Sequence, residues 1–171
     1  WLVALLGACG QVDELPVEPG VSLALAEHRA GRLAGLQYRL HFDIPAQQLQ
    51  PIHGEIEIRF TLANASAPLQ LDFRAGAEAV KTLVVNGRAL TALPRREHIV
   101  LPAASLRAGA NTVAMTFVAG DSALNRNPDY LYTLLVPDRA RTAFPLFDQP
   151  DLKATWELSL RLPTDWTALA N

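Results

Sequence analysis

Residues 127–153, NPDYLYTLLVPDRARTAFPLFDQPDLK, form the least generic stretch of this 171-residue chain. Prolines at positions 137, 145 and 150 fix the backbone φ angle and prevent a long helix or a central strand. Charged and aromatic residues both lie between these prolines, and Asp148-Gln149-Pro150 has the composition of a turn. We therefore expect an ordered loop that packs against a sheet, with the rest of the chain providing that sheet.

The upstream residues follow the two-residue period of half-buried strands. From Gly35, apolar residues at 36, 38, 40, 42 and 44 alternate with polar ones, and a second alternating run covers 55–62. The turn between Pro45 and Pro51 predicts that these two strands form an antiparallel hairpin. Asn86-Gly87 predicts a second, two-residue hairpin turn, because both positions tolerate a positive φ angle.

Further short extended runs are predicted at 69–73, 80–85, 88–93, 98–101, 113–117 and 156–162. One short helix is predicted from Leu23 to Ala30, with Ser22 as its N-cap and Gly31 at its end. Many short strands separated by turn residues are typical of a β-sandwich. The expected fold is all-β: a saddle-like antiparallel β-sandwich of two sheets with one short N-terminal helix.

Composition narrows the class of function. With 50% hydrophobic and 19% charged residues, a chain of this length can bury a substantial core in one domain. The net charge of −2, the pI near 6.1 and the lack of a basic run beyond Arg95-Arg96 exclude an electrostatic footprint for nucleic acid. The single cysteine, Cys9, excludes an internal disulfide framework.

The N-terminus indicates a secreted, anchored protein. Residues 1–9, WLVALLGAC, end in Leu-Gly-Ala-Cys, which is similar to the lipobox of bacterial lipoproteins and predicts lipidation of Cys9. Gly10 after the cysteine favours the outer-membrane or periplasmic side of a bacterial cell envelope. A short buried strand with an inert thiol is the alternative interpretation. Residues 10–20, rich in proline and acid, are expected to be a solvated tether, and the folded domain is expected to cover 21–171.

The 127–153 stretch and the residues after it also resemble a known family. The resemblance is carried by Tyr132-Thr133, Pro137, Ala140-Arg141, Phe144-Pro145, Phe147-Asp148-Gln149-Pro150, Lys153-Ala154, Pro163, Trp166 and Asn171. These residues look like the N-terminal β-domain of the aminopeptidase N family of zinc metallopeptidases, over roughly residues 20–171. The chain starts without an initiator methionine, and the family's β-domain continues further. We therefore expect a piece that is incomplete at both ends.

The resemblance implies a non-catalytic role for this chain within a zinc aminopeptidase that removes N-terminal residues from peptides. The His-Glu-x-x-His motif that binds zinc is absent from the sequence, as is the family's Gly-x-Met-Glu-Asn signature. No catalytic residue and no metal ligand are therefore predicted here, and the chain alone is expected to be inactive. Zinc, the peptide substrates and the catalytic domain as partner all belong to the parent enzyme.

The resemblance also suggests roles for individual residues. In many members, a glutamine and a glutamate that face the substrate's N-terminus stand where this chain has Leu134 and Val136. Either the substrate's amine is held only by the catalytic domain, or the cavity wall is apolar at these two positions. Asp138, two residues further on, is a third candidate, as a substitute for the missing polar side chain. A structural role is expected for Tyr132, Arg141, Phe144, Pro145, Phe147, Asp148 and Pro150. Arg141 and Asp148 are expected to be charge partners, and Phe144, Phe147 and Trp156 to pack in a core or domain interface.

Two alternatives stay open. His41 and Asp43 on one strand, and His53, Glu55 and Glu57 on the next, could gather around a metal, although alternating solvent-facing charges produce the same pattern. The chain could also be a free-standing envelope lipoprotein whose β-sandwich binds peptides, glycans or a protein partner.

Overall fold

The structure, a computed structural model, describes residues 15–170. These residues form the helix α1 (Leu23–Ala30), ten strands and three short 3-10 helices. The strands are β1 (Leu33–Asp43), β2 (His53–Leu62), β3 (Leu69–Asp72), β4 (Val80–Val85), β5 (Arg88–Ala89), β6 (His98–Leu101), β7 (Gly109–Val118), β8 (Leu124–Arg126), β9 (Leu131–Thr133) and β10 (Ala154–Arg161). The 3-10 helices are η1 (Ala77–Ala79), η2 (Ala103–Ser105) and η3 (Ala140–Thr142).

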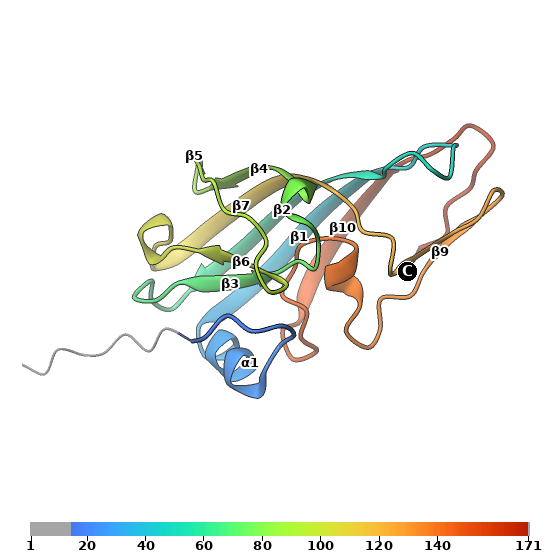
Figure 1. Cartoon of the computed structure of the whole chain (residues 1–171). Coiled ribbons are helices and arrows are strands. Elements are labelled where there is room, and N and C mark those ends of the chain that lie inside the picture. Colours follow the sequence, from blue (N-terminus) through green and yellow to red (C-terminus); the bar gives the residue numbers. More distant parts are fainter. Residues whose placement is uncertain (1–14, 171) are drawn as a thin grey trace, which may run out of the picture.

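Two layers of strands make up the body. The main sheet has six strands in the order β10-β1-β2-β7-β4-β5, and the second layer is the antiparallel pair β3-β6. In Figure 1 the pair β3-β6 lies in front of the main sheet. Helix α1 lies at the bottom of the picture, and β9 lies at the right-hand end of the molecule. The prediction of a mostly-β, two-sheet fold with one short N-terminal helix is confirmed.

The two predicted hairpins are also present. Strands β1 and β2 pair antiparallel, with Leu40 opposite Ile56. Strands β4 and β5 are joined at Asn86-Gly87, whose φ angles are 51° and 81°. The helix begins as predicted, since the Ser22 hydroxyl accepts a hydrogen bond from the Leu25 N–H at 3.2 Å.

The main sheet is mixed, whereas the sequence predicted antiparallel pairing. Strand β10 runs parallel to β1, with Leu36 opposite Ala154 and Asp43 opposite Arg161. The physical reason lies in residues 119–153, which lead the chain back along the molecule so that β10 starts beside the first half of β1. A parallel neighbour requires a long connection of this kind. Alternation along a strand reports which side chains are buried, not the direction of its neighbour.

The core lies between the main sheet, the β3-β6 pair and the loop 140–149. Alternate residues of β1, β2 and β7 point into it, and aromatic rings meet edge to face: Phe73 and Phe117 have centroids 5.6 Å apart, and Phe42 and Phe144 6.1 Å. Each such fully buried side chain contributes roughly 1.5–3 kcal/mol to folding. The loop that follows β9 is thus part of the core rather than a surface connection.

The N-terminal predictions fall partly outside the described residues. Cys9, the lipobox and residues 10–14 of the predicted tether lie in that part of the chain, so they stay predictions. Residues 15–20 of the predicted tether lie against α1 and the β3-β6 pair and do not extend into solvent. Their backbone is hydrogen-bonded to the side chains of Gln70, Glu97 and His98. Among the described residues, no helix is long and apolar enough to cross a membrane.

Candidate functional site

The loop after β9 is anchored on one buried carboxylate, that of Asp72 at the end of β3. Asp72 Oδ2 accepts hydrogen bonds from Arg29 Nη1 at 2.9 Å and from the Asp148 backbone N–H at 2.8 Å. The Arg29 and Asp72 side chains are both fully buried. One carboxylate therefore ties together helix α1, strand β3 and the loop.

Gln149 adds a second link between the loop and the helix. Its side-chain Nε2 donates to the carbonyl of Ala26 at 3.1 Å and to Asp151 Oδ1 at 2.9 Å, while its Oε1 accepts from Arg29 at 3.4 Å. The Asp148-Gln149-Pro150 turn is thus held by Asp72 at Asp148 and by Ala26 and Arg29 of α1 at Gln149. Pro150 itself is exposed at the turn.

Aromatic residues fix the loop to the main sheet. The Phe147 backbone N–H donates to the hydroxyl of Tyr38 at 3.0 Å, and the Phe147 ring lies 5.4 Å from the Arg29 guanidinium. Phe144 and Phe147 are buried and Pro145 lies between them. Trp156 stacks on Tyr38 with centroids 4.1 Å apart but keeps 48% of its surface exposed.

Arg141 is the centre of a second charged cluster. Its Nη1 lies 3.4 Å from Asp148 Oδ2, its Nη2 3.0 Å from Asp138 Oδ2 and its Nε 3.1 Å from Glu97 Oε2. The structure therefore brings Arg141 and Asp148 together as charge partners. Burial lowers the pKa of Arg141, but the hydrogen bonds that it donates to the carboxylates of Asp138 and Glu97 outweigh burial and hold that pKa above its usual value.

The carboxylates of Asp72 in β3 and Asp148 in the loop differ in their pKa shifts. Burial alone would raise the pKa of Asp72, but the contacts with His98 and Arg29 and the Asp148 N–H hold it below its usual value. For Asp148, burial raises the pKa. The hydrogen bond from the Arg141 backbone N–H and the positive charge of Arg141 lower it by less, so the pKa of Asp148 stays above its usual value. Burial also raises the pKa of Tyr38. These shifts belong to a structural network, since the carboxylates are occupied by protein partners.

Four residues of this network were not singled out from the sequence: Arg29, Asp72, Glu97 and His98. The signal was weak, because Leu69, Leu71 and Phe73 alternate with Gln70 and Asp72, as in a half-buried strand whose polar residues face solvent. A charged residue inside an apolar strand must find a partner when it is buried. Sequence alone does not say which partner it finds.

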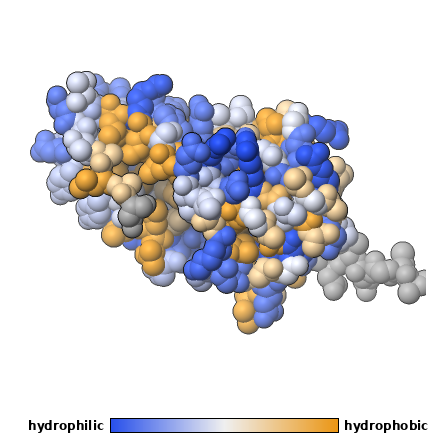
Figure 2. All heavy atoms as spheres, turned by 180° about the vertical axis from the view of Figure 1, so that it is seen from behind, coloured by the Kyte–Doolittle hydropathy of each residue, from blue (hydrophilic) through white to orange (hydrophobic). Residues whose placement is uncertain are grey.

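The predicted wall residues lie on the opposite, exposed side of the loop. Leu134 is 46% and Val136 82% exposed, and they follow the β8-β9 hairpin, where Tyr130 and Tyr132 stack with centroids 6.3 Å apart. Asp138 is exposed too, but its carboxylate is engaged by Arg141. Figure 2 shows hydrophobic residues gathered mainly over the left half of that face of the molecule. The large exposed apolar residues of the 130–158 region are Tyr130, Tyr132, Leu134, Val136, Trp156 and Leu158.

The histidines and carboxylates of β1 and β2 do not form a metal centre. Register places His41 opposite Glu55, and Asp43 opposite His53. However, His41 Nδ1 is hydrogen-bonded to Ser159 at 2.7 Å, and Asp43 pairs with Arg161 at 2.9 Å. Within residues 15–170, no group of three potential ligands could hold a metal ion. The donor set of the described residues therefore does not fit a zinc ion.

A comparison with known proteins identifies the fold. Residues 110–171, which include the anchored loop and β10, match the family described as Peptidase M1 N-terminal domain. The chain carries an M1 peptidase N-terminal domain. This M1 N-terminal domain is 31% identical to Aminopeptidase N of Streptomyces lividans over 90% of its own length, and 30% identical to Probable M1 family aminopeptidase 1 of Encephalitozoon cuniculi over 82%. It spans only 19% and 18% of the lengths of those two relatives.

Solved structures with the same fold include leukotriene A4 hydrolase from Saccharomyces cerevisiae and an M1 zinc metallopeptidase from Deinococcus radiodurans. The first has a TM-score of 0.61 at 19% identity and covers 76% of this chain and 23% of the hydrolase. The second has a TM-score of 0.60 at 16% identity and covers 75% of this chain and 32% of the metallopeptidase. The predicted resemblance to the N-terminal β-domain of this family is confirmed.

Proposed function

We propose that this M1 N-terminal domain is the non-catalytic N-terminal part of a zinc aminopeptidase, where it supports the catalytic domain and forms part of the wall of the substrate cavity. The family match and the curated aminopeptidase relatives support this proposal. In such an enzyme, bound zinc activates the attacking water. The described residues of this chain would support the catalytic domain and shape the substrate cavity.

The observation that carries the proposal is a rigidly anchored loop with an exposed apolar side. Residues 140–149 are held by Asp72, Gln149 and the buried aromatic rings. In the preceding segment, the Leu134 N–H donates to the Ala123 carbonyl at 2.9 Å and the Arg139 N–H to the Leu135 carbonyl at 3.0 Å. Leu134 and Val136 nevertheless expose 46% and 82% of their surface. Exposed apolar groups on a fixed support are typical of a surface that another protein part covers.

The contact of Asp138 with Arg141 favours one interpretation of this loop. Its carboxylate is bound to the nearly buried Arg141 at 3.0 Å, so withdrawing it would leave a buried cation with one contact fewer. We infer that Asp138 does not bind the substrate's amine. The amine is then held by groups outside this chain, and Leu134 and Val136 present an apolar wall to the substrate's first residues.

The test uses the full-length protein and aminoacyl arylamides. The full-length protein is expected to hydrolyse them, whereas the 171-residue chain alone is not. Changing Leu134→Asp should lower kcat/KM for substrates with an apolar first residue by about tenfold or more, because a charge replaces an apolar contact. Leu93→Asp is the control, since Leu93 is 56% exposed and lies outside the loop. Equal kcat/KM values for the two variants would refute the proposal that Leu134 lines the substrate cavity.

We also propose that Cys9 is lipidated and anchors the protein at a bacterial cell envelope. The support is the apolar run ending in Leu-Gly-Ala-Cys, which lies outside the described residues. Expression of the full-length gene in a bacterial host with labelled palmitate should label the protein, and Cys9→Ser should abolish the label. An unlabelled wild-type protein would refute the proposal that Cys9 is lipidated.

A further inference from the structure

The turn that leads into β6 has an unusual backbone. Arg95 and His98 form an antiparallel bridge, and the two residues between them, Arg96 and Glu97, have φ angles of 47° and 69°. Two-residue turns with positive φ angles favour asparagine and glycine. The Asn86-Gly87 turn of this chain uses that pair, with φ angles of 51° and 81°. Arg96 and Glu97 therefore adopt a conformation that is unfavourable for their residue types, and residues under such strain cluster at functional sites.

The two side chains of this turn have different surroundings. Arg96 is exposed, whereas the Glu97 side chain is only 18% exposed. Glu97 Oε2 accepts hydrogen bonds from Arg141 Nε and from the Gly20 N–H, both at 3.1 Å, and Oε1 lies 3.3 Å from Arg74 Nε. Charge-assisted hydrogen bonds of this kind are stronger than neutral ones. The contacts of the Glu97 carboxylate therefore offset the cost of its backbone conformation.

Gly20 is the last residue of a segment that lies across the β3-β6 pair. Residues 15–20, called the strap below, are held along their backbone by three side chains of the β3-β6 region. Gln70 Nε2 donates to the Leu15 carbonyl at 3.1 Å, His98 Nε2 lies 2.7 Å from the Glu18 carbonyl oxygen, and Glu97 Oε2 accepts the Gly20 N–H. Glu97 therefore holds the end of the strap that leads into α1.

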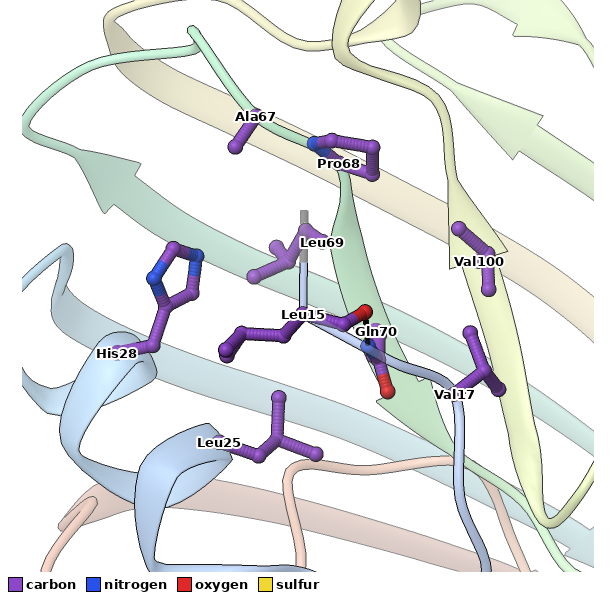
Figure 3. Close-up of a pocket in the computed structure, with 9 residues that line it drawn as sticks. All are labelled: Leu15, Val17, Leu25, His28, Ala67, Pro68, Leu69, Gln70 and Val100. Atoms are coloured by element: carbon purple, nitrogen blue, oxygen red, sulfur yellow. Dashed lines mark hydrogen bonds between the residues drawn. The ribbon is translucent and has the colours of Figure 1, made fainter. Parts of the chain in front are cut away.

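Apolar side chains hold the start of the strap. Figure 3 shows Leu15 pointing between α1 and Leu69 of β3, while Val17 lies next to Val100 of β6. The space left between these groups is only about 10 Å³, too little for more than about one water molecule. The strap is thus packed in a groove between α1 and the β3-β6 pair.

Arg141, the other partner of Glu97 Oε2, holds an exposed turn of the loop. The Arg139 N–H donates to the Leu135 carbonyl at 3.0 Å and closes this turn over residues 135–139. Within the turn, Asp138 Oδ2 accepts a hydrogen bond from Arg141 Nη2 at 3.0 Å. The Arg141 side chain is 7% exposed and that of Asp138 64%. The nearly buried guanidinium thus connects the exposed turn to the carboxylate oxygen that also holds the strap.

We propose that Glu97 is a positioning residue that couples the strap to the exposed turn 135–139. One oxygen atom, Oε2, accepts from a backbone amide of the strap and from the guanidinium that holds Asp138, so the strap and the turn share one contact. When either donor withdraws, the carboxylate loses one of the contacts that place it, and the other donor loses a fixed partner. Val136, in the same turn, is thereby placed through Asp138. The consequence for substrates rests on the function proposed above, whereas the coupling does not.

The first test is amide hydrogen exchange of the full-length protein, followed by mass spectrometry of peptides that cover residues 15–22 and 134–142. Glu97→Asn introduces a residue that tolerates a positive φ angle but is uncharged and one methylene shorter, so the turn is kept and both contacts of Oε2 are lost. Exchange in both peptides should rise roughly two- to tenfold, as for the loss of one hydrogen bond. Unchanged exchange in either peptide would overturn the proposal.

Arg96→Asn is the matched control for this variant. It introduces the same side chain at the neighbouring position, which also has a positive φ angle, but Arg96 is exposed. Exchange in both peptides should stay at the wild-type level. A rise equal to that of Glu97→Asn would assign the effect to the turn rather than to the carboxylate and would contradict the proposal.

Gly20→Pro breaks the coupling from the side of the strap. Proline has no N–H to donate to Glu97, and its fixed φ angle is incompatible with the 80° of Gly20. Exchange of residues 134–142 should therefore rise, although the substitution lies outside the loop. Because both changes remove the same link, the double variant with Glu97→Asn should show no further rise in this peptide. A rise equal to the product of the two single effects would show that Glu97 does not connect the two segments.

The consequence for substrates is tested by selectivity. In the full-length protein, Glu97→Asn should lower the ratio of kcat/KM for leucyl and alanyl arylamides about twofold or more, because the larger side chain depends more on the wall. A general loss of folded enzyme would lower both values equally and leave the ratio unchanged. An unchanged ratio would therefore overturn the positioning role. A wild-type protein that hydrolyses neither arylamide would instead contradict the proposed function, and the exchange measurements would still decide the coupling.

Discussion

Arg29 and Asp72 form a fully buried ion pair that joins helix α1 to the end of strand β3, with Nη1 2.9 Å from Oδ2. The same carboxylate accepts the Asp148 N–H of the loop. Three segments far apart in the sequence therefore meet at one charge. The loop that follows the exposed residues 134–138 therefore ends on this carboxylate.

Replacing Asp72→Asn should strongly destabilise the domain. It removes the charge that compensates the buried Arg29, and breaking a buried pair costs about 3–5 kcal/mol. The free energy of unfolding in urea measures this loss. Asp43→Asn is the matched control, because Asp43 and its partner Arg161 are exposed by 42% and 72%, and such a pair contributes only about 0–1 kcal/mol. Similar losses for both variants would mean that the buried pair has no special role.

The stability of the domain should fall on the acid side because of Asp72. The native pKa of Asp72 is depressed below the unfolded value of about 3.9, so its contribution is complete above about pH 4. It is lost as pH falls through the lower native pKa. Asp148 acts with the opposite sign, because burial raises its native pKa and its protonated form favours the fold at low pH. Urea unfolding at several pH values should show a shallower acid decline in Asp72→Asn than in the wild type.

Gly120→Ala should disturb the start of the connection to β8. A Cβ atom at Gly120 would lie 2.1 Å from the carbonyl oxygen of Thr142 in η3, a backbone atom that cannot move alone. We expect a loss of about 1–3 kcal/mol, as for overpacked cores. Gly31→Ala is the control: its φ angle is −74° and the nearest atom is 3.5 Å away, so its unfolding free energy should be unchanged or slightly higher. A neutral Gly120→Ala would show that η3 is not held against this segment.

Tyr38→Phe should destabilise the loop anchor. The Tyr38 hydroxyl accepts the Phe147 N–H at 3.0 Å in the core, and its removal leaves a buried donor without a partner. The expected cost is about 1–3 kcal/mol in thermal or chemical unfolding. Tyr132→Phe removes the same hydroxyl from a ring that is 48% exposed and should change the stability little. If the two variants behave alike, the hydrogen bond to Phe147 does not anchor the loop.

Local patterns predicted most of the strands. The alternation along β1 and β2 and the Asn86-Gly87 turn depend on neighbouring residues only, so the sequence showed them directly. The alternation at 156–162 also predicted β10, but Trp156 and Leu158 remain half exposed, because β10 is the edge of the main sheet and no described residue covers them fully. Burial of an edge strand depends on what lies beyond it, which its own pattern does not contain.

The anchoring network could not be predicted in the same way. Arg29 lies on a short helix and His98 beside a turn, positions where charges are usually solvated. Their burial results from contacts over 43 residues for Arg29 and Asp72, and over 80 residues for His98 and Glu18. Residues 15–20 were predicted to belong to a solvated tether, because the segment 10–20 is rich in proline and acidic residues. Their backbone carbonyls, a group that every residue has, bind them to Gln70 and His98.

We propose that this M1 N-terminal domain belongs to a longer zinc aminopeptidase whose catalytic domain covers the exposed apolar residues. The most direct measurement is the nucleotide sequence of the gene beyond the codon for Asn171. The account predicts an open reading frame that continues into a His-Glu-x-x-His segment. A stop codon directly after Asn171 would contradict it.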